Sequence, residues 1–340
     1  MKPVSIIGGG LSGLSLAGAL QRAGVETTLY ETRAYPQHKV CGEFICGVNE
    51  EVLGSLELNH IITSSIHHSK MKWYMGDSLI AKSKMPKTAW GISRYELDQF
   101  LAHRFQKDGG TLIKEKRTIE NREGVVLGCG KGKNSAKKWI GLKVHLTQVP
   151  EEWKNGLQMY VGNAGYVGLC AVDESRVNLC GLFLVNPSVK GKGSELLRNY
   201  IQEIGLSALA EQMIECEKDE NSFSAVAGFS LGPQSKNGNF QLGDASYLIP
   251  PFTGNGMSMA IESAYLASQT LLRYCRGELD WSQSCVLYNQ KFQVQFKKRA
   301  RLAQIIHPVL FSPLGRASLT GLARTNLLPI QTLFTQLRTP

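Results

Sequence analysis

The stretch Val4-Ser5-Ile6-Ile7-Gly8-Gly9-Gly10-Leu11-Ser12-Gly13 decides the fold of this chain. Its apolar first part is typical of a strand, its Gly-x-Gly-x-x-Gly part forms a turn, and residues 14–23 continue as a helix. In that order, this glycine spacing marks a dinucleotide-binding unit. The glycines permit a tight turn and close approach of the backbone, so a pyrophosphate can rest on the unpaired amides of the helix N-terminus. The candidate binding residues are therefore Gly8, Gly10, Ser12 and Gly13.

A carboxylate stands where the adenosine end of such a cofactor is expected. Glu31 follows the next predicted strand, residues 26–30. At this distance from the glycines, a carboxylate can accept hydrogen bonds from ribose hydroxyls. We therefore predict that Glu31 binds the adenosine half of the dinucleotide.

A second motif, far along the chain, predicts the other half of the same site. Gly243-Asp244 follows a short predicted strand, and Pro250-Pro251-Phe252-Thr253-Gly254-Asn255-Gly256-Met257 leads into an apolar helical run. Gly-Asp alone is most often an ordinary turn. Together with the fingerprint it predicts FAD, with Asp244 on the ribityl chain and Gly254, Asn255, Gly256 and Met257 at the pyrimidine end of the isoalloxazine. A helix that begins there would stabilise the negative charge that the ring gains on reduction.

Length and cysteine usage narrow the class of protein. A chain of 340 residues with one fingerprint favours a single body of two interleaved parts. The first strand follows directly after Pro3, and no run of about 18 apolar residues occurs, so we expect a cytoplasmic protein without signal peptide or membrane span. Eight cysteines without Cys-x-x-Cys spacing predict reduced thiols and no metal site. No cysteine or histidine lies in an evident linkage motif, so the FAD is expected to be non-covalent.

The order of patterns predicts an α/β protein, with a Rossmann-like FAD-binding unit around a parallel sheet and a substrate unit around an antiparallel sheet. Alternation at residues 139–146 and 176–183 is typical of antiparallel strands, which would roof the flavin. From Thr253 onward the pattern is helical, with breaks expected at Pro308, Pro313 and Pro329. The predicted FAD-binding unit comprises residues 1–60, 92–138 and 236–290. The predicted substrate unit comprises residues 61–91 and 139–235, and residues 291–340 form a basic C-terminal helical segment.

The C-terminal segment combines positive charge with an apolar stripe. Its fifty residues carry eight lysines or arginines and no acidic residue, in a chain of formal net charge +10. Ile330, Leu333, Phe334 and Leu337 follow helical spacing. The segment could lie peripherally on the inner, anionic face of a membrane or dock a partner, but such stripes more often pack on their own domain, which we favour. No stacking platform accompanies the basic residues, so nucleic-acid binding is not expected.

These motifs, over about residues 3–290, resemble the family of FAD-dependent oxidoreductases that includes the geranylgeranyl reductases, and more distantly the aromatic hydroxylases and flavin-dependent halogenases. The resemblance implies a parallel sheet that holds FAD and an antiparallel sheet that walls a substrate pocket. The loop 39–44 is expected close to the cofactor through Gly42. The resemblance implies that Glu31 contacts the adenosine ribose and that Arg33 lies near the ADP. It implies Arg94 on the phosphate or ribityl region and Asp244 on the ribityl or pyrophosphate. At the ring it implies Gly256 and Met257, with Cys41 as a loop cysteine beside the flavin.

Three departures from the family pattern bear on the reaction. Gly130-Lys131-Gly132 stands where Ala-Asp-Gly is usual, so a carboxylate is missing and direct reduction by NAD(P)H is in doubt; a separate electron donor is the alternative. Residues 166–171 lack the aromatic wall of the prenyl reductases, which indicates a flatter or bulkier substrate. The halogenase Trp-x-Trp-x-x-Pro is absent, which makes halogenation remote.

Few residues are candidates for the chemistry, because a flavin transfers electrons itself and the protein mainly positions substrate and excludes water. Cys41 could donate a proton or only shape the pocket, and Tyr166 could hydrogen-bond the substrate or only pack. Lys143 and His145 share one face of a predicted strand and could reach the pocket, but a solvated outer face is favoured. Cys41 and Tyr166 are thus the catalytic candidates.

Three functions remain open at this point. The first is a reductase or dehydrogenase of a hydrophobic metabolite, with hydride transfer at flavin N5. The second is a monooxygenase that acts through a C4a-hydroperoxide and must keep that adduct dry. The third is a flavin-binding, membrane-associated module without turnover.

Overall fold

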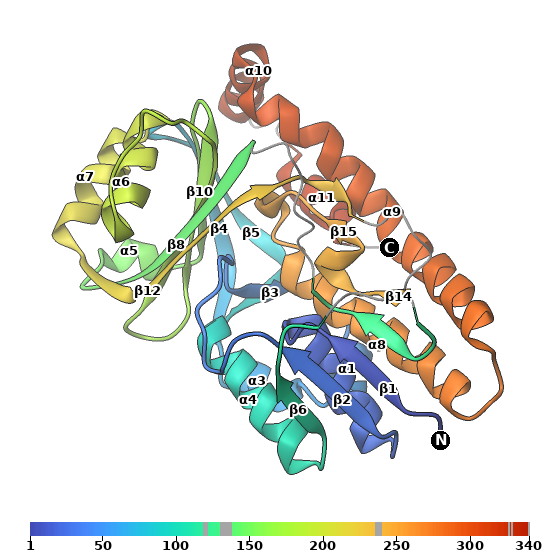
Figure 1. Ribbon diagram of the computed structural model, residues 1–340. Helices are drawn as coiled ribbons and strands as arrows, with labels where there is room; N and C mark the ends of the chain where they lie inside the picture. Colours follow the sequence, from blue (N-terminus) through green and yellow to red (C-terminus); the bar gives the residue numbers. More distant parts are fainter. Residues whose placement is uncertain (118–121, 130–137, 235–239, 326, 328, 339–340) are drawn as a thin grey trace.

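The computed structural model describes the chain except residues 118–121, 130–137, 235–239, 326, 328 and 339–340. Two sheets form two adjoining units, and the long helix α9 runs along the outside of the smaller one (Figure 1). Helices α6 and α7 lie on the outer side of the larger sheet (Figure 1). The molecule therefore has the two interleaved parts that the sequence predicts.

The smaller sheet is parallel throughout and has the order β14-β7-β1-β2-β6. Its strands are short apolar runs: β1 (Val4–Ile7), β2 (Thr27–Glu31), β6 (Thr111–Lys114), β7 (Val125–Leu127) and β14 (Phe240–Gln241). The carboxyl ends of parallel strands share one edge of a sheet. The glycine loop after β1, Glu31 at the end of β2, and Gly243-Asp244 after β14 therefore meet at that edge. The predicted Rossmann-like unit is confirmed.

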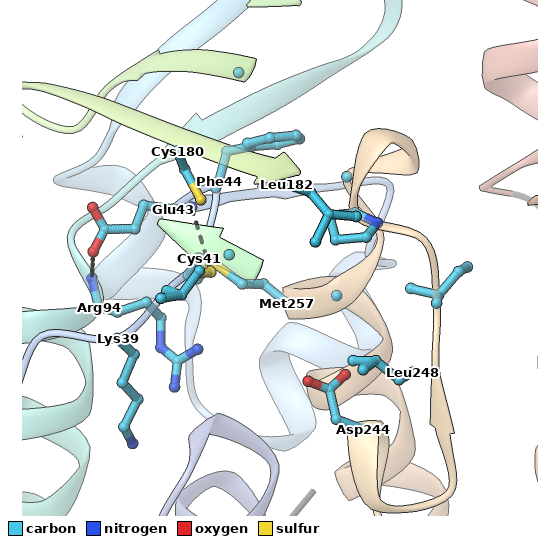
Figure 2. Close-up of a pocket in the computed structure, with 18 of the residues that line it drawn as sticks. Lys39, Cys41, Glu43, Phe44, Arg94, Cys180, Leu182, Asp244, Leu248 and Met257 are labelled. Carbon is cyan, nitrogen blue, oxygen red and sulfur yellow. Dashed lines mark hydrogen bonds between the residues drawn. The ribbon is translucent and has the colours of Figure 1, made fainter. Parts of the chain in front are cut away.

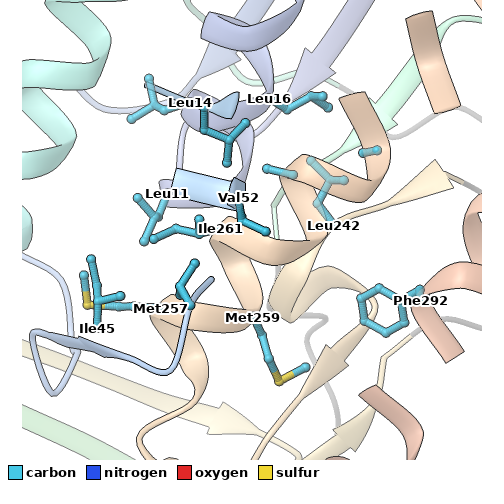
Figure 3. Close-up of a cluster of buried hydrophobic side chains, with 14 of the residues drawn as sticks. Leu11, Leu14, Leu16, Ile45, Val52, Leu242, Met257, Met259, Ile261 and Phe292 are labelled. Carbon is cyan, nitrogen blue, oxygen red and sulfur yellow. The ribbon is translucent and has the colours of Figure 1, made fainter. Parts of the chain in front are cut away.

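Three helices cover this sheet and fix the two sequence motifs to one another. They are α1 (Leu11–Arg22), α4 (Arg94–Lys107) and α8 (Gly256–Cys275), and α1 packs against both others. Figure 3 shows Leu11 and Leu14 of α1 near Ile261 of α8, and all three are buried. Full burial of such a side chain stabilises the fold by roughly 1.5–3 kcal/mol. Because α1 follows the glycine loop and α8 follows the Pro250–Met257 loop, this interface fixes the positions of the two halves of the site relative to one another.

The larger sheet has eight strands in the order β12-β8-β11-β10-β9-β4-β5-β3. We expected it to be antiparallel, and one neighbouring pair is not: β4 and β9 are parallel, with Met71 opposite Leu157. Alternation within one strand indicates its two faces but not the direction of its neighbour, so the sequence could not show this. The strands are β3 (Phe44–Cys46), β4 (Ile66–Met75), β5 (Ser78–Gly91), β8 (Trp139–Thr147), β9 (Leu157–Val161), β10 (Gly165–Ala171), β11 (Val177–Leu184) and β12 (Glu217–Phe229).

Both faces of this sheet are covered. Leu142, Val144 and Leu146 of β8 pack in the core beneath α6 (Gly193–Glu203) and α7 (Ser207–Glu215). Residues between them in sequence face the FAD-binding unit instead. The remaining short elements are α2 (Glu50–Ser55), α3 (Asn59–Thr63), α5 (Glu151–Lys154), the two-stranded sheet β13 (Gly232–Pro233) with β15 (Tyr247–Leu248), and the 3-10 helices η1 (Gly243–Ala245) and η2 (Pro251–Thr253).

The C-terminal part is helical, as predicted, but one expected break is wrong. Helix α9 (Trp281–Phe311) continues through Pro308. A proline inside a helix costs about 3 kcal/mol, and the buried neighbours His307 and Leu310 offset that cost by packing on the body. Helix α10 (Pro313–Arg324) begins at its proline, and α11 (Ile330–Gln336) begins after Pro329. Within the described part of the chain, no helix has the length and apolar character needed to cross a membrane.

Candidate functional site

Residues from both units line one cavity of about 1120 Å³. The glycine loop and Glu31 lie along it, and so do Asp244 and residues 253–257 except Asn255. Figure 2 shows Asp244 and Met257 on one side and Cys41, Glu43 and Arg94 on another. Pockets for one small ligand usually measure about 300–1,000 Å³. This cavity is therefore larger than the usual pocket for a single small ligand.

The glycine loop leaves room where a cofactor backbone would approach. A Cβ atom added at Gly10 would meet no heavy atom within 4 Å. At Gly8, which has φ 110°, it would overlap the backbone of Cys129, and at Gly13 it would overlap the carbonyl oxygen of Gly8. Gly13 thus allows α1 to pack on the end of β1, whereas Gly10 opens toward the cavity. No side chain caps α1, so its first amides are available to an anion.

Glu31 stands beside this loop and organises it. Its Oε2 accepts a hydrogen bond from the amide of Gly9 at 3.0 Å, and its Oε1 accepts from the amides of Thr32 and Arg33 at 2.8 and 3.2 Å. Tyr35 donates its hydroxyl proton to the carbonyl of Gly9 at 2.5 Å. The carboxylate lines the cavity and is held at the position where ribose hydroxyls are expected.

The second half of the site is a turn followed by the N-terminus of a 20-residue helix. Asp244 lies in η1, and the amide of Gly243 donates to Ser263 Oγ of α8 at 3.0 Å. Gly254 has φ 63°, a left-handed conformation that glycine adopts without strain, and α8 begins at Gly256. The partial positive charge of a helix N-terminus therefore points into the cavity at this end.

The structure brings together most of the residues predicted for the cofactor. Gly13 and Asn255 do not line the cavity: Gly13 packs against Gly8, and the Asn255 side chain donates to the carbonyl of Leu337 at 2.8 Å. The fingerprint's third glycine has this packing role in general. The predicted residues that line the cavity are Gly8, Gly10, Ser12, Glu31, Arg33, Gly42, Arg94, Asp244, Gly254, Gly256 and Met257.

Arg94 is held by the carboxylate of Asp98, which was not among the residues predicted for the site. Its Nε and Nη2 donate to the two oxygens of Asp98 at 2.8 and 2.7 Å, and Lys39 Nζ lies 2.9 Å from the same carboxylate. Burial alone would raise the pKa of Asp98, but the two cations hold it below its ordinary value. Arg94 and Asp98 are four residues apart on α4, a spacing at which helical ion pairs form, so a signal was present in the sequence.

Lys143 and His145 are buried, and the solvated outer face favoured for them is wrong. Neither side chain is exposed. His145 Nε2 lies 2.5 Å from Glu43 Oε2, and Lys143 Nζ lies 3.4 Å from Glu43 Oε1. These two side chains face the loop 39–44 because their neighbours Leu142, Val144 and Leu146 occupy the opposite face of β8. The loop covers that face, which local alternation could not predict.

Glu43 joins this buried cluster to the cavity. It has φ 56°, unusual for a residue with a side chain, and its Oε1 accepts from the amide of Arg94 at 2.9 Å. Burial by itself would raise the pKa of Glu43, but the hydrogen bond with His145 and the charge of Lys143 outweigh it and lower the pKa. His38 Nδ1 lies 3.2 Å from Lys143 Nζ, and burial together with that charge lowers the pKa of His38 to about 4. A carboxylate held as the anion thus stands at the cavity wall.

Both catalytic candidates line the cavity. Burial raises the pKa of the Cys41 thiol, with Arg94 acting in the opposite direction, so the thiol keeps its proton at neutral pH. Tyr166 is buried, its hydroxyl oxygen accepts from the amide of Phe252 at 3.2 Å, and burial raises its pKa well above the ordinary value. Cys41 can therefore donate a proton, and Tyr166 holds the turn before α8 while facing the substrate space.

The C-terminal segment forms part of the wall. Leu333, Phe334, Leu337 and Arg338 line the cavity, and Leu337 and Arg338 are buried. Arg299 is also buried, against Glu262 at 2.6 Å, so two of the segment's eight positive charges are not on the surface. No pattern in the sequence distinguished these two arginines from the other six lysines and arginines of the segment. Lys131, on which the doubt about NAD(P)H depends, lies outside the described residues.

Comparison with known proteins shows the same architecture. A family model described as the NAD(P)-binding Rossmann-like domain matches residues 6–37. The flavin-dependent brominase Bmp2 superposes with a TM-score of 0.76 at 15% identity, over 100% of this chain and 94% of the brominase. The p-nitrophenol 4-monooxygenase PnpA from Pseudomonas putida DLL-E4 superposes with a TM-score of 0.75 at 13% identity, over 100% of this chain and 98% of the enzyme.

One similarity by sequence adds to these. The chain is 25% identical over 343 residues to conditioned medium factor receptor 1 of Dictyostelium discoideum, and it spans 66% of that protein's length while 85% of this chain is covered. At identities this low, the structural matches establish the fold that this chain shares with a flavin-dependent brominase and a monooxygenase. They do not single out the geranylgeranyl reductases, so that narrower resemblance stays a prediction.

Proposed function

We propose that the chain is an FAD-dependent oxidoreductase that acts on a hydrophobic small molecule. One observation carries the proposal: the glycine loop with Glu31 and the Asp244 turn with the N-terminus of α8 line a single cavity. We assign these two motifs to the two ends of a dinucleotide site within this cavity of about 1120 Å³. The two motifs are more than two hundred residues apart in sequence. Chance is therefore a poor explanation for their lining the same cavity.

The residues present fit FAD. A Cβ atom would meet nothing within 4 Å at Gly10 and at Gly256, so backbone amides are open to a ligand at both ends. Gly10 to Ser12 would hold the pyrophosphate, Glu31 the adenosine ribose, and Asp244 the ribityl chain. When bound, the flavin supplies the two-electron transfer. We propose that all of these contacts are non-covalent.

The cavity beyond the flavin site suits an apolar substrate. Leu169 and Leu182 from the larger sheet, Leu248 and Phe252 near the turn, and Leu310 of α9 line it. Tyr166 lies among them, and Cys41 stands at the other side with its proton retained. Such a lining excludes water and orients a hydrophobic molecule by shape, with few polar contacts.

For the reaction we propose reduction or dehydrogenation of the substrate, with Cys41 positioned to exchange a proton. Monooxygenation is the second candidate, and it is supported by the shared fold with the brominase and the p-nitrophenol monooxygenase. The two differ in what the reduced protein does with oxygen. A module that binds flavin without turnover is the third, and it predicts no reaction with any donor.

The discriminating experiment follows the bound flavin by absorbance. The purified protein, expected to be yellow, is reduced without oxygen and then mixed with air-saturated buffer with and without candidate apolar substrates. Simple reoxidation, together with flavin-dependent reduction of an unsaturated substrate, supports the first reaction. A long-lived oxygen adduct supports the second, and protein that never retains flavin would contradict the proposal as a whole.

We propose further that NAD(P)H reduces this flavin poorly and that a separate protein or small molecule delivers the electrons. The basis is the missing carboxylate at Gly130-Lys131-Gly132. Stopped-flow mixing with NADPH should bleach the flavin slowly. Rapid bleaching by micromolar NADPH without a partner would contradict this part alone.

A further inference from the structure

The C-terminal arginine connects the two segments that border the pyrimidine end of the proposed flavin site. Arg338 Nη2 donates to the carbonyl of Thr253 at 2.8 Å, and Nη1 donates to the carbonyl of Cys46 at 3.3 Å. Thr253 immediately precedes the Gly254 turn, and Cys46 ends β3, which follows the loop 39–44. Arg338 lines the cavity although it lies 292 residues from Cys46 in sequence.

The charge of Arg338 is not neutralised by the described residues. Of the ion pairs that they form, none includes Arg338, and the nearby carboxylate of Glu262 is bound by Arg299. Its Nε is buried without a hydrogen-bond partner, and the guanidinium stacks 3.9 Å from the ring centroid of Phe334. Burial lowers the pKa of Arg338, but arginine stays protonated in proteins. A buried charge that has no counter-charge among the described residues is costly, so an anionic partner is expected beside it.

The position of the guanidinium indicates where that partner lies. A Cβ atom at Gly254 would lie 2.9 Å from Arg338 Nη2, so the cation is adjacent to the turn. The next residue, Asn255, binds the carbonyl of Leu337 and fixes the tail on the same turn. Helix α8 begins at Gly256 with its positive N-terminal end toward the cavity. A side-chain cation and a helix dipole therefore converge on one region.

We propose that Arg338 faces the pyrimidine edge of the bound flavin and raises its reduction potential. The inference rests on the proposed function, because it needs FAD to bind with this edge at residues 254–257. Two electrons and one proton convert neutral oxidised flavin into a reduced form with one negative charge near N1 and O2. A fixed cation at that edge stabilises the reduced form more than the oxidised form.

The experiment measures FAD occupancy first and potential second. Full-length wild type, R338M, R338K and R301M are titrated with FAD, and the loaded proteins are then reduced by dithionite in equilibrium with a reference dye. Arg301 is an exposed arginine of α9 and gives a matched loss of charge away from the cavity. R338M keeps an unbranched apolar stem, and urea unfolding of each apoprotein identifies any variant that has lost its fold.

We expect R338M to bind FAD stoichiometrically at sufficient concentration and to favour the oxidised form at least tenfold more than wild type does. For a two-electron couple a tenfold change is about 30 mV. R338K should fall between the two and R301M should match wild type. An unchanged potential in folded, FAD-loaded R338M would overturn the inference, as would tighter FAD binding by that variant, because the arginine would then occupy the ring's place. Failure of wild type to bind FAD would overturn the proposed function instead.

Discussion

The carboxylate of Glu43 and the imidazole of His145 lie 2.5 Å apart, and neither side chain is exposed. Glu43 belongs to the loop that borders the flavin site, and His145 belongs to β8 of the larger sheet. Lys143 adds a positive charge on the other oxygen of the same carboxylate. Glu43 therefore joins the two units through a buried hydrogen bond with His145 and a buried ion pair with Lys143, and these contacts fix the loop whose residues 41–43 face the cavity.

Replacing Glu43 by glutamine should destabilise the fold at neutral pH and have a smaller effect in acid. Removing one partner of a buried ion pair costs about 3–5 kcal/mol, because the Lys143 charge stays buried. The pKa of Glu43 is lowered in the fold, so its stabilisation is complete above the unfolded value of about 4.3 and is lost as pH falls below it. Urea unfolding of wild type and E43Q from pH 7 to pH 3.5 measures the difference.

The matched control is E211Q on the outer helix α7, where the glutamate is exposed. It should unfold like wild type at every pH. A constant difference between E43Q and wild type across the acid range would contradict the assignment of charge to Glu43.

Two glycines of the fingerprint should separate cofactor binding from folding. G10A should leave the unfolding free energy of the apoprotein within about 0.5 kcal/mol of wild type, because its new methyl group meets no protein atom. It should weaken FAD binding, since the methyl group points into the space of the pyrophosphate. G13A should destabilise the apoprotein itself, because its methyl group overlaps the Gly8 carbonyl. Urea unfolding and FAD titration of both variants check this, and equal behaviour of the two would argue against the cofactor position.

The two carboxylates of the site should each contribute to FAD affinity. E31A and D244A should each lose about 1.5–3 kcal/mol of binding free energy, roughly 10- to 150-fold in Kd, because each removes a charge-assisted hydrogen bond. Glu31 also holds the amides of Gly9 and Thr32, so E31A should loosen the glycine loop as well. Calorimetric titration with FAD measures both effects. If the double variant still retained stoichiometric FAD after dialysis, the binding mode would be wrong.

The glycine loop, Glu31 and the Asp244 turn could be predicted because local rules specify them: glycine at a tight turn, a carboxylate at a strand end, and a helix N-terminus after a turn. The Glu43–His145 contact could not, because it joins residues 102 positions apart that no local pattern connects. Lys143 and His145 were correctly placed on one face of a strand. Whether this face was buried depended on the loop 39–44, which packs on it from the other unit. The position of Arg338 depended on the path of the whole C-terminal segment.

Truncation after Ser312 should lower stability without changing membrane binding. The shortened chain loses Leu337, whose burial alone is worth roughly 1.5–3 kcal/mol, and it loses the contacts of Leu333, Phe334 and Arg338 with the cavity wall. Leu333, Phe334 and Leu337 line the cavity, so these three side chains face the body of the protein rather than a lipid surface. Urea unfolding of the intact and shortened chains measures the first effect, and L337A in the intact chain should reproduce part of it.

Sedimentation with vesicles tests the second effect. Both chains should sediment equally with phosphatidylserine vesicles at low salt and with neutral phosphatidylcholine vesicles. Each basic group near an anionic surface is worth about 1 kcal/mol and is screened within a Debye length, so attachment through the segment would fall steeply with added salt. Salt-sensitive binding of the intact chain alone would show that residues 313–340 leave the body to meet the membrane. Equal sedimentation of the two chains would support the role that the buried residues of the segment indicate, which is to form a wall of the flavin and substrate cavity.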